Sequence, residues 1–161
     1  MSQNQVLIIL NGEDKRVLTK NSNKIIITNK KSYKIDQDHT LLQSNFGSVD
    51  EFIKAKVIIK NLFSKIDEIV LINKDIDLNM ISYQYDFENI KQNYQTLLNI
   101  IYFINLLIPL FNEKFCFVLS LEKDNHYKIH LNNFKISLIN YLNALKKDLI
   151  KSKDIKIKIL D

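Results

Sequence analysis

The chain has 161 residues, a length that predicts a single domain able to bury about 70% of the surface that its unfolded form exposes. Its 46% apolar and 25% charged residues are typical of globular proteins, and its single cysteine excludes a disulfide framework and a cysteine-based metal site. The apolar start at residues 6–10 is too short for an export signal. We therefore expect one cytoplasmic domain spanning residues 1–161.

The net charge of +5 comes from 22 lysines and one arginine, Arg16, set against 18 acidic residues. The basic runs are interleaved with acids and asparagines. They lack the arginine clusters and exposed aromatic side chains that nucleic-acid recognition favours. The charge therefore does not favour a nucleic-acid partner.

Six short runs of apolar or β-branched residues are typical of strands whose two faces are both covered. In chain order they are residues 6–10, 24–28, 40–44, 68–73, 115–121 and 155–160. Three helical patterns lie between the later runs. From residue 40 onward this alternation predicts right-handed βαβ units on a parallel sheet.

The first helical pattern begins with a capping box, Ser48 to Glu51, and runs to about Ile66. The side chains that we expect to face the core are Val49, Phe52, Ile53, Ile59, Leu62 and Phe63.

The second helical pattern begins near Asp86, whose carboxylate suits a helix N-terminus, and continues to about Phe111. Residues 96–111 are almost entirely apolar, but they fall short of the roughly 20 residues that a membrane helix needs. Asn99, Asn105 and Pro109 also interrupt them. We expect a helix buried in protein and no membrane span.

The third helical pattern covers residues 130–149 and carries an apolar stripe. Lys135 lies beside that stripe, at the edge of the buried face. By default such a lysine is a solvated side chain whose stem lies along apolar neighbours.

The first 40 residues allow two interpretations. Residues 14–20 have room for a short crossover helix, or else Asn11-Gly12 forms a hairpin turn in a β-meander. We favour the crossover because the strands are purely apolar instead of alternating. The expected fold class is α/β and Rossmann-like, with a mostly parallel sheet of about six strands and helices on both faces. The first crossover helices are expected to be shortened or missing.

From residue 40 to the end, the order of these features resembles the short-chain dehydrogenase/reductase family. Residues 67–73, Asp-Glu-Ile-Val-Leu-Ile-Asn, are similar to its fourth strand, and residues 86–110, which close on Leu-Ile-Pro-Leu, to its long fifth segment. Residues 117–120, Phe-Val-Leu-Ser, resemble the strand that delivers a catalytic serine. Residues 134–138, Phe-Lys-Ile-Ser-Leu, resemble the helix that carries a catalytic lysine.

The resemblance implies a hydride transfer in which a tyrosine exchanges a proton and a lysine four residues later lowers the tyrosine's pKa. It assigns Lys135, Ser120 and Asn93 as remnants of the family's lysine, serine and asparagine. Leu131, which has no ionisable proton, stands at the tyrosine position. In the family's enoyl reductase branch the tyrosine lies farther before the lysine. Tyr127 is a candidate acid only if the distance to Lys135 may be one residue longer than in that branch.

The cofactor side departs further from the family, whose Thr-Gly-x-x-x-Gly-x-Gly turn lets backbone amides approach the pyrophosphate. Here the first strand runs into Asn11, Gly12, Glu13 and Asp14, with one glycine and two carboxylates where a dianion would sit. Lys74 places a side chain where the family leaves room for the cofactor. We therefore expect no cofactor.

The histidines, His39, His126 and His130, are too scattered to predict a metal site. The expected function is a pseudoenzyme, a non-catalytic reductase-like scaffold or interaction subunit that associates through its helices. The alternative is a residual NAD(P)-dependent oxidoreductase, acting on a carbonyl or enoyl substrate, with a reduced cofactor site.

A helix that is apolar all round must bury a second face, so the second and third helices are expected to meet a partner. In the family these two helices form a four-helix contact between subunits. We expect a homodimer, or a heterodimer with an intact reductase-like subunit. The expected interface residues are Leu97, Ile101, Ile104, Ile108, Tyr141 and Leu142.

Overall fold

The computed structural model describes residues 2–12, 14, 16, 22–29, 39–44, 46–74, 87–121 and 129–160. In chain order its elements are β1 (Gln3–Asn11), β2 (Ser22–Thr28), β3 (His39–Gln43), α1 (Val49–Leu62), β4 (Ile66–Asn73), α2 (Phe87–Leu107), the 3-10 turn η3 (Ile108–Leu110), β5 (Phe111–Leu121), α3 (Ile129–Asp148) and β6 (Asp154–Leu160). All six expected strands are confirmed, most of them starting a few residues earlier than the sequence indicates.

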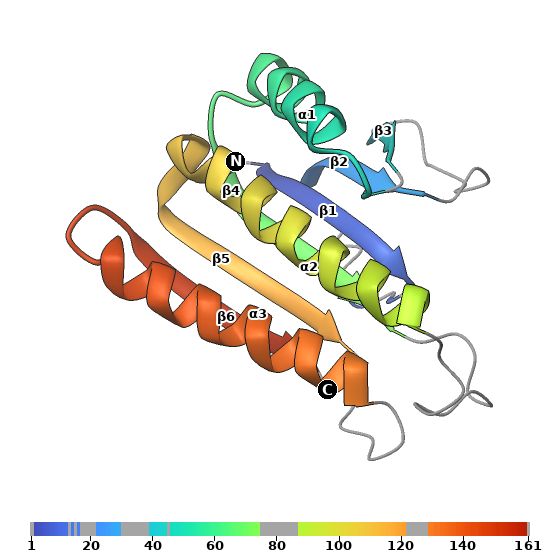
Figure 1. Ribbon diagram of the computed structural model, residues 1–161. Helices are drawn as coiled ribbons and strands as arrows, with labels where there is room; N and C mark the ends of the chain where they lie inside the picture. Colours follow the sequence, from blue (N-terminus) through green and yellow to red (C-terminus); the bar gives the residue numbers. More distant parts are fainter. Residues whose placement is uncertain are drawn as a thin grey trace.

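The strands form one sheet in the order β3-β2-β1-β4-β5-β6, and every neighbouring pair is parallel (Figure 1). This confirms the Rossmann-like α/β class. Because β1 and β2 pair in parallel, they cannot be joined by a two-residue hairpin, so the β-meander is wrong. From β1 the chain builds outward through β2 and β3, and then returns to build β4, β5 and β6 on the other side. The strand order therefore reverses between β1 and β4.

One face of the sheet packs against all three described helices (Figure 1). Aromatic rings join two of these helices: Phe52 of α1 stacks on Phe103 of α2 with ring centroids 4.7 Å apart. From α2 the fully buried side chains are Leu97, Ile100, Phe103, Ile104 and Leu107. Each large apolar side chain buried in this way contributes about 1.5–3 kcal/mol, so the packing of α2 is a main source of stability.

The residues of α1 that face the core differ in part from those predicted from the sequence. Phe52, Ile59 and Phe63 are buried as expected, but Val49, Ile53 and Leu62 are exposed. The buried stripe follows the spacing of residues 52, 55, 59 and 63, which leaves positions 49 and 53 on its flank. The helix also ends at Leu62, because Ile66 already begins β4.

The second face of the sheet carries its own apolar cluster, built by strand residues. Its buried members are Leu7, Ile9, Ile26, Val70, Ile72 and Val118. The connections from β3 to β4, from β4 to β5 and from β5 to β6 all cross the sheet in the same direction. Because such crossovers are right-handed, α1, α2 and α3 lie on the first face. Helices were expected on both faces of the sheet. Within the described residues they are found on one face. Residues 17–21 and 30–38, which connect β1 to β2 and β2 to β3 along the chain, lie outside the described part.

The apolar stretch of α2 does not form a membrane span: none of the described helices is long and apolar enough to cross a bilayer. Its polar interruptions have structural roles. Asn99 is buried, and its Nδ2 donates a hydrogen bond of 2.8 Å to the Phe46 carbonyl ahead of α1. Pro109 lies in η3, where the helix ends. The expectation of a helix buried in protein is confirmed for its inner face.

Candidate functional site at the carboxyl end of the sheet

The carboxyl ends of β1, β4 and β5 meet where the strand order reverses, the position at which open parallel sheets bind ligands. Asn11 and Asn73 end β1 and β4 in register, and the Asn11 side-chain amide donates to Asn73 Oδ1 over 3.4 Å. One residue on, the Lys74 N–H donates to the Asn11 carbonyl over 3.0 Å. The backbone of Lys74 is thereby tied to the end of β1.

Gly12 makes this close approach possible. Its φ of +78° lies in the left-handed region, which side chains disfavour. A Cβ built on Gly12 would lie 2.8 Å from Lys74 Cβ and 3.1 Å from the Lys74 carbonyl oxygen. This glycine therefore makes room for the backbone of Lys74 beside the end of β1.

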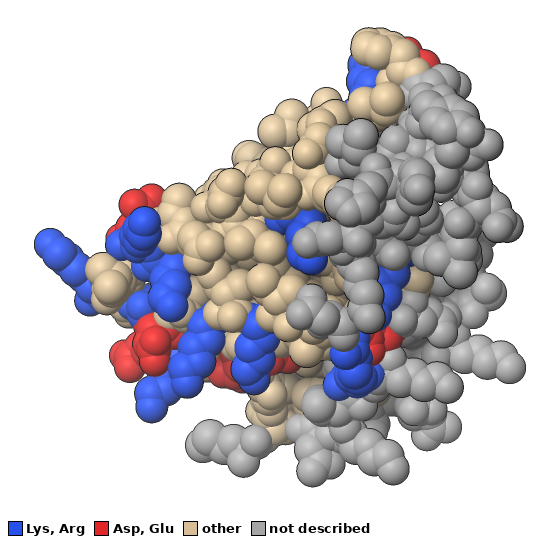
Figure 2. Space-filling view, turned by 90° about the horizontal axis from the view of Figure 1, so that it is seen from below, with Lys and Arg blue, Asp and Glu red and all other residues tan. Residues whose placement is uncertain are grey.

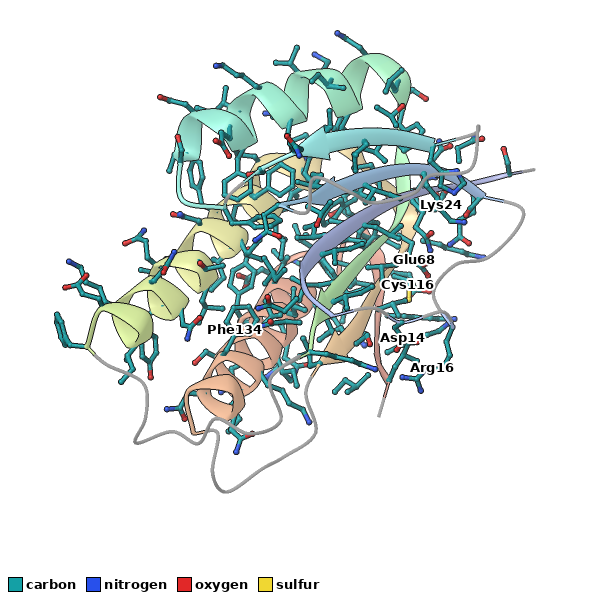
Figure 3. The ribbon with its side chains drawn as sticks, turned by 90° about the vertical axis from the view of Figure 1, so that its right-hand side faces the viewer. Asp14, Arg16, Lys24, Glu68, Cys116 and Phe134 are labelled. Carbon is teal, nitrogen blue, oxygen red and sulfur yellow. The ribbon has the colours of Figure 1, made fainter. Side chains whose placement is uncertain are left out.

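Asp14 lies at the centre of a polar cluster at this edge, next to Arg16 (Figure 3). Its side chain is only 4% exposed. Its Oδ2 accepts hydrogen bonds from Arg16 Nη2 at 2.6 Å, Ser120 Oγ at 2.6 Å and Lys74 Nζ at 3.0 Å. Its Oδ1 accepts from Arg16 Nε at 2.9 Å and from the Arg16 backbone N–H at 3.0 Å. The carboxylate is thus surrounded by donors from three separate parts of the chain.

These contacts fix the charge state of Asp14. The Arg16 guanidinium, with hydrogen bonds from Ser120 and Lys74, holds the pKa of the Asp14 carboxyl far below its usual range and outweighs the opposing effect of burial. Asp14 is therefore ionised at neutral pH, and its charge is compensated by Lys74 and Arg16.

The family-equivalent remnants are placed as follows. Ser120 is fully buried at the end of β5, where its hydroxyl donates to Asp14. Asn93 is half-buried on α2 and lines a narrow gap between α2 and α3 together with Phe134. Lys135 is half-buried on α3. The structure thus pairs the Ser120 hydroxyl with the Asp14 carboxylate.

Two sequence-based assignments are only partly covered by the structure. Leu131, at the position that the resemblance gives to the tyrosine, lies in the first turn of α3. Tyr127, the weak candidate acid, lies outside the described residues, and so does Glu13.

The interface residues expected from sequence fall into two groups. Leu97, Ile104 and Leu142 are buried in the chain's own core, so in this structure they are not available to a partner. Ile101, Ile108 and Tyr141 are half-buried, and the Tyr141 hydroxyl donates to Asn105 Oδ1 over 2.8 Å between α3 and α2. The exposed apolar residues of α2 include Leu98, at 59% exposure, and Tyr102, at 40%. The chain's own sheet and helices thus cover most of the apolar side chains of α2.

The other candidate chemistry finds no support in the described residues. They contain no group of three side chains that could hold a metal ion. Cys116 is half-buried and lies on the second face of the sheet near Glu68 (Figure 3). Burial, reinforced by the Glu68 charge, raises the pKa of the Cys116 thiol. A protonated thiol is a poor nucleophile.

Sequence reasoning placed Asp14 at this edge but missed its partners. Arg16 is two residues away, and Lys74 follows the strand that pairs with β1. The ends of neighbouring parallel strands meet at one edge of the sheet. An acidic residue after one strand and a basic residue after its neighbour could therefore have indicated an ion pair.

Comparison with known proteins identifies the fold. No family model and no curated protein matches the chain. A short chain dehydrogenase family protein from Francisella tularensis is 17% identical, with a TM-score of 0.76 over 99% of this chain and 68% of its own. A 3-ketoacyl-(acyl-carrier-protein) reductase from Brucella melitensis, complexed with NADH, is 16% identical, with a TM-score of 0.74 over 98% of this chain and 74% of its own. A short-chain dehydrogenase/reductase from Saccharomyces cerevisiae is 12% identical, with a TM-score of 0.72 over 97% and 70%.

These comparisons confirm the resemblance at the level of fold: the chain has a short-chain dehydrogenase/reductase fold. The first 40 residues, which the sequence resemblance did not include, are part of that match, since nearly the whole chain is covered.

Proposed function

We propose that this protein is a non-catalytic, degenerate relative of the short-chain reductases that works as a scaffold or interaction subunit. The observation that carries the proposal is the Asp14 cluster. It joins the loop after β1 to Lys74 after β4 and Ser120 of β5, at the edge where open parallel sheets bind ligands. Ion pairs between the chain's own side chains occupy this edge of the sheet. In the proposal they stabilise the fold, and the edge no longer binds a ligand.

The catalytic side supports the same proposal. Reduction of a carbonyl by hydride transfer needs a proton donor near the reacting oxygen. Leu131 cannot donate a proton, and the Ser120 hydroxyl is already engaged by Asp14. Lys135 therefore has no phenol at the family spacing whose pKa it could lower.

The interaction surface that we propose lies on the outer side of α2 and α3. Leu98 and Tyr102 are one helical turn apart on α2, and the half-buried Ile101 and Tyr141 lie beside them toward α3. A patch of this kind on neighbouring helices suits association with a second copy, or with an intact reductase-like subunit that presents the same two helices.

Light scattering after size exclusion tests this surface. We expect a dimer of the wild-type chain at micromolar concentration, or a complex once the heteromeric partner is supplied. The double variant Leu98→Lys/Tyr102→Lys should be monomeric, since two buried charges would oppose the contact.

A matched control comes from α1, where Ile53 and Val57 are also exposed and one turn apart. Ile53→Lys/Val57→Lys should leave the association unchanged. Loss of the dimer in the α1 variant but not in the α2 variant would move the interface to α1. The proposal would be refuted if the wild-type chain stayed a stable monomer and bound none of the reductase-like proteins that copurify with it from its own cell.

A further inference from the structure

α1 exposes more large aliphatic side chains than the other two helices do. Among their described side chains α2 and α3 expose one each, Leu98 and Ile136. Of the nine exposed positions of α1, five are aliphatic, with exposed fractions from 36% to 54%: Val49, Ile53, Val57, Ile58 and Leu62. Single exposed apolar residues are normal on a protein surface, but five on a helix of 14 residues form a continuous surface.

The aliphatic side chains cover the half of α1 that points away from the core. The buried side chains of α1 within the helix, Phe52, Ala55 and Ile59, mark the direction of the core. At about 3.6 residues per turn, Val57 lies roughly opposite them, with Ile53 on one flank and Ile58 and Leu62 on the other. Figure 1 shows α1 as the outermost of the three helices, with α2 between it and α3. The aliphatic surface of α1 is therefore convex and faces solvent.

Two lysines lie among these aliphatic side chains. The exposed Lys54 lies one turn before Ile58, and the exposed Lys60 lies one turn after Val57. A lysine in such a place can extend its apolar stem along its neighbours and keep its ammonium group at the level of the water. The surface is therefore both aliphatic and basic.

The two acids of α1 lie at its amino end, away from most of this surface. Glu51 is half-buried, and its Oε2 accepts a hydrogen bond of 2.6 Å from Ser44 Oγ, in the loop before the helix. Asp50 is exposed in the first turn, whereas Lys60 lies in the last turn. The carboxyl-terminal two thirds of α1 thus expose positive charge only.

A convex aliphatic and basic surface suits a lipid layer better than a protein partner. A protein would need a groove to cover half of a helix. Protein interfaces are also enriched in tyrosine, tryptophan and arginine, which α1 lacks. Lipid headgroups, in contrast, rearrange around a helix that lies in their plane, and anionic headgroups attract lysines. This arrangement differs from a membrane span, for which no described helix is long and apolar enough.

We propose that α1 is a docking surface for an anionic lipid bilayer. The helix would lie along the surface of the bilayer, with Ile53, Val57, Ile58 and Leu62 among the headgroups and the first carbons of the acyl chains. Lys54 and Lys60 would contact lipid phosphates. This surface is separate from the one proposed above on α2 and α3, and either can fail alone.

The test uses sedimentation with sucrose-loaded vesicles of phosphatidylcholine that contain about one third phosphatidylglycerol, and with vesicles of phosphatidylcholine alone. Insertion is measured separately. The chain has no tryptophan, so Val57→Trp introduces a single fluorescent reporter at the centre of the surface. Contact with the acyl chains shifts its emission to the blue and lets brominated lipids quench it.

We expect binding to the anionic vesicles that added salt weakens, little binding to the neutral ones, and a blue shift of the reporter. Ile53→Ser/Val57→Ser should weaken binding about tenfold or more, because two inserted side chains are lost. Its circular dichroism should stay that of wild type, since both positions are exposed. Lys54→Gln/Lys60→Gln should weaken binding about tenfold.

Two control variants separate α1 from the rest of the surface. Lysines are not confined to α1: seen from below, on the side away from α1, they gather in a row (Figure 2). Lys146→Gln/Lys147→Gln, at exposed positions near the end of α3, removes the same charge. Ile150→Ser/Ile159→Ser removes two exposed isoleucines that belong to neither proposed surface. Both controls should bind the anionic vesicles as wild type does.

Three results would overturn the proposal. Absence of sedimentation at millimolar anionic lipid would leave the α1 surface to a protein partner. Equal weakening by a control variant would show that the site is not on α1. Sedimentation without a blue shift or quenching of the reporter would show attraction by charge alone, with the aliphatic side chains still in water.

Discussion

Replacing Asp14 by asparagine should destabilise the fold by about 2–3 kcal/mol at neutral pH. The substitution keeps the size of the side chain but removes the charge that faces Lys74 and Arg16 and turns one acceptor into a donor. Breaking a buried pair by removing one partner typically costs about 3–5 kcal/mol. The lower figure applies here because Arg16 is 50% exposed and Lys74 29% exposed, so both cations can regain water.

The pH dependence gives the same substitution a sharper signature. The pKa of Asp14 is far below its usual range in the folded state and near 3.9 in an unfolded chain, so its charge stabilises the fold fully above about pH 5. That contribution is lost as the pH falls below the unfolded value. The difference between wild type and Asp14→Asn should therefore be about 1 kcal/mol smaller at pH 3 than at pH 7.

Urea unfolding followed by circular dichroism at the two pH values measures this difference. Asp148→Asn, at an exposed position at the end of α3, is the matched control and should change stability by less than about 0.5 kcal/mol. An Asp14→Asn variant as stable as wild type at pH 7, or a difference that does not change with pH, would refute the assignment of Asp14 as an ionised structural group.

Three further outcomes follow from the same contacts. Gly12→Ala should lower the free energy of unfolding by about 1–3 kcal/mol, because the positive φ and the contact with the Lys74 backbone both oppose a side chain; an unchanged urea midpoint would contradict this. Ser120→Ala should cost about 1–2 kcal/mol in the same assay, since Asp14 loses a buried donor, and an increase in stability would show that the hydroxyl is not needed. Lys135→Ala should change stability by no more than about 1 kcal/mol and leave the association seen in light scattering intact, whereas loss of a cellular activity from this change alone would revive the catalytic interpretation.

Much of the fold could be predicted from sequence because the strands are short apolar runs whose type does not depend on distant residues. The parallel sheet followed from the alternation with helices, and β1 to β6 all lie where the runs indicate. The face of α1 could not be predicted, since Val49 and Phe52 are equally apolar and only the position of the sheet decides which one is buried. For the same reason the sequence overstated how much of α2 is open to a partner.

The candidate site was predictable only in part. The missing glycines and the carboxylate at position 14 are visible in the sequence, and they indicate a poor phosphate site. The role of Asp14 is not visible there, because its partners Lys74 and Ser120 are 60 and 106 residues away along the chain. Contacts of this range appear only when the ends of parallel strands are brought to one edge.

Titration calorimetry with NADH and NADPH tests the central claim most directly. Because Asp14 is held by Arg16, Lys74 and Ser120 at the edge that would receive the pyrophosphate, we predict no heat of binding for either cofactor up to millimolar concentration. Micromolar binding of either one, weakened by substitutions at Lys74 or Gly12, would contradict the account and identify the chain as a reductase that retains its cofactor.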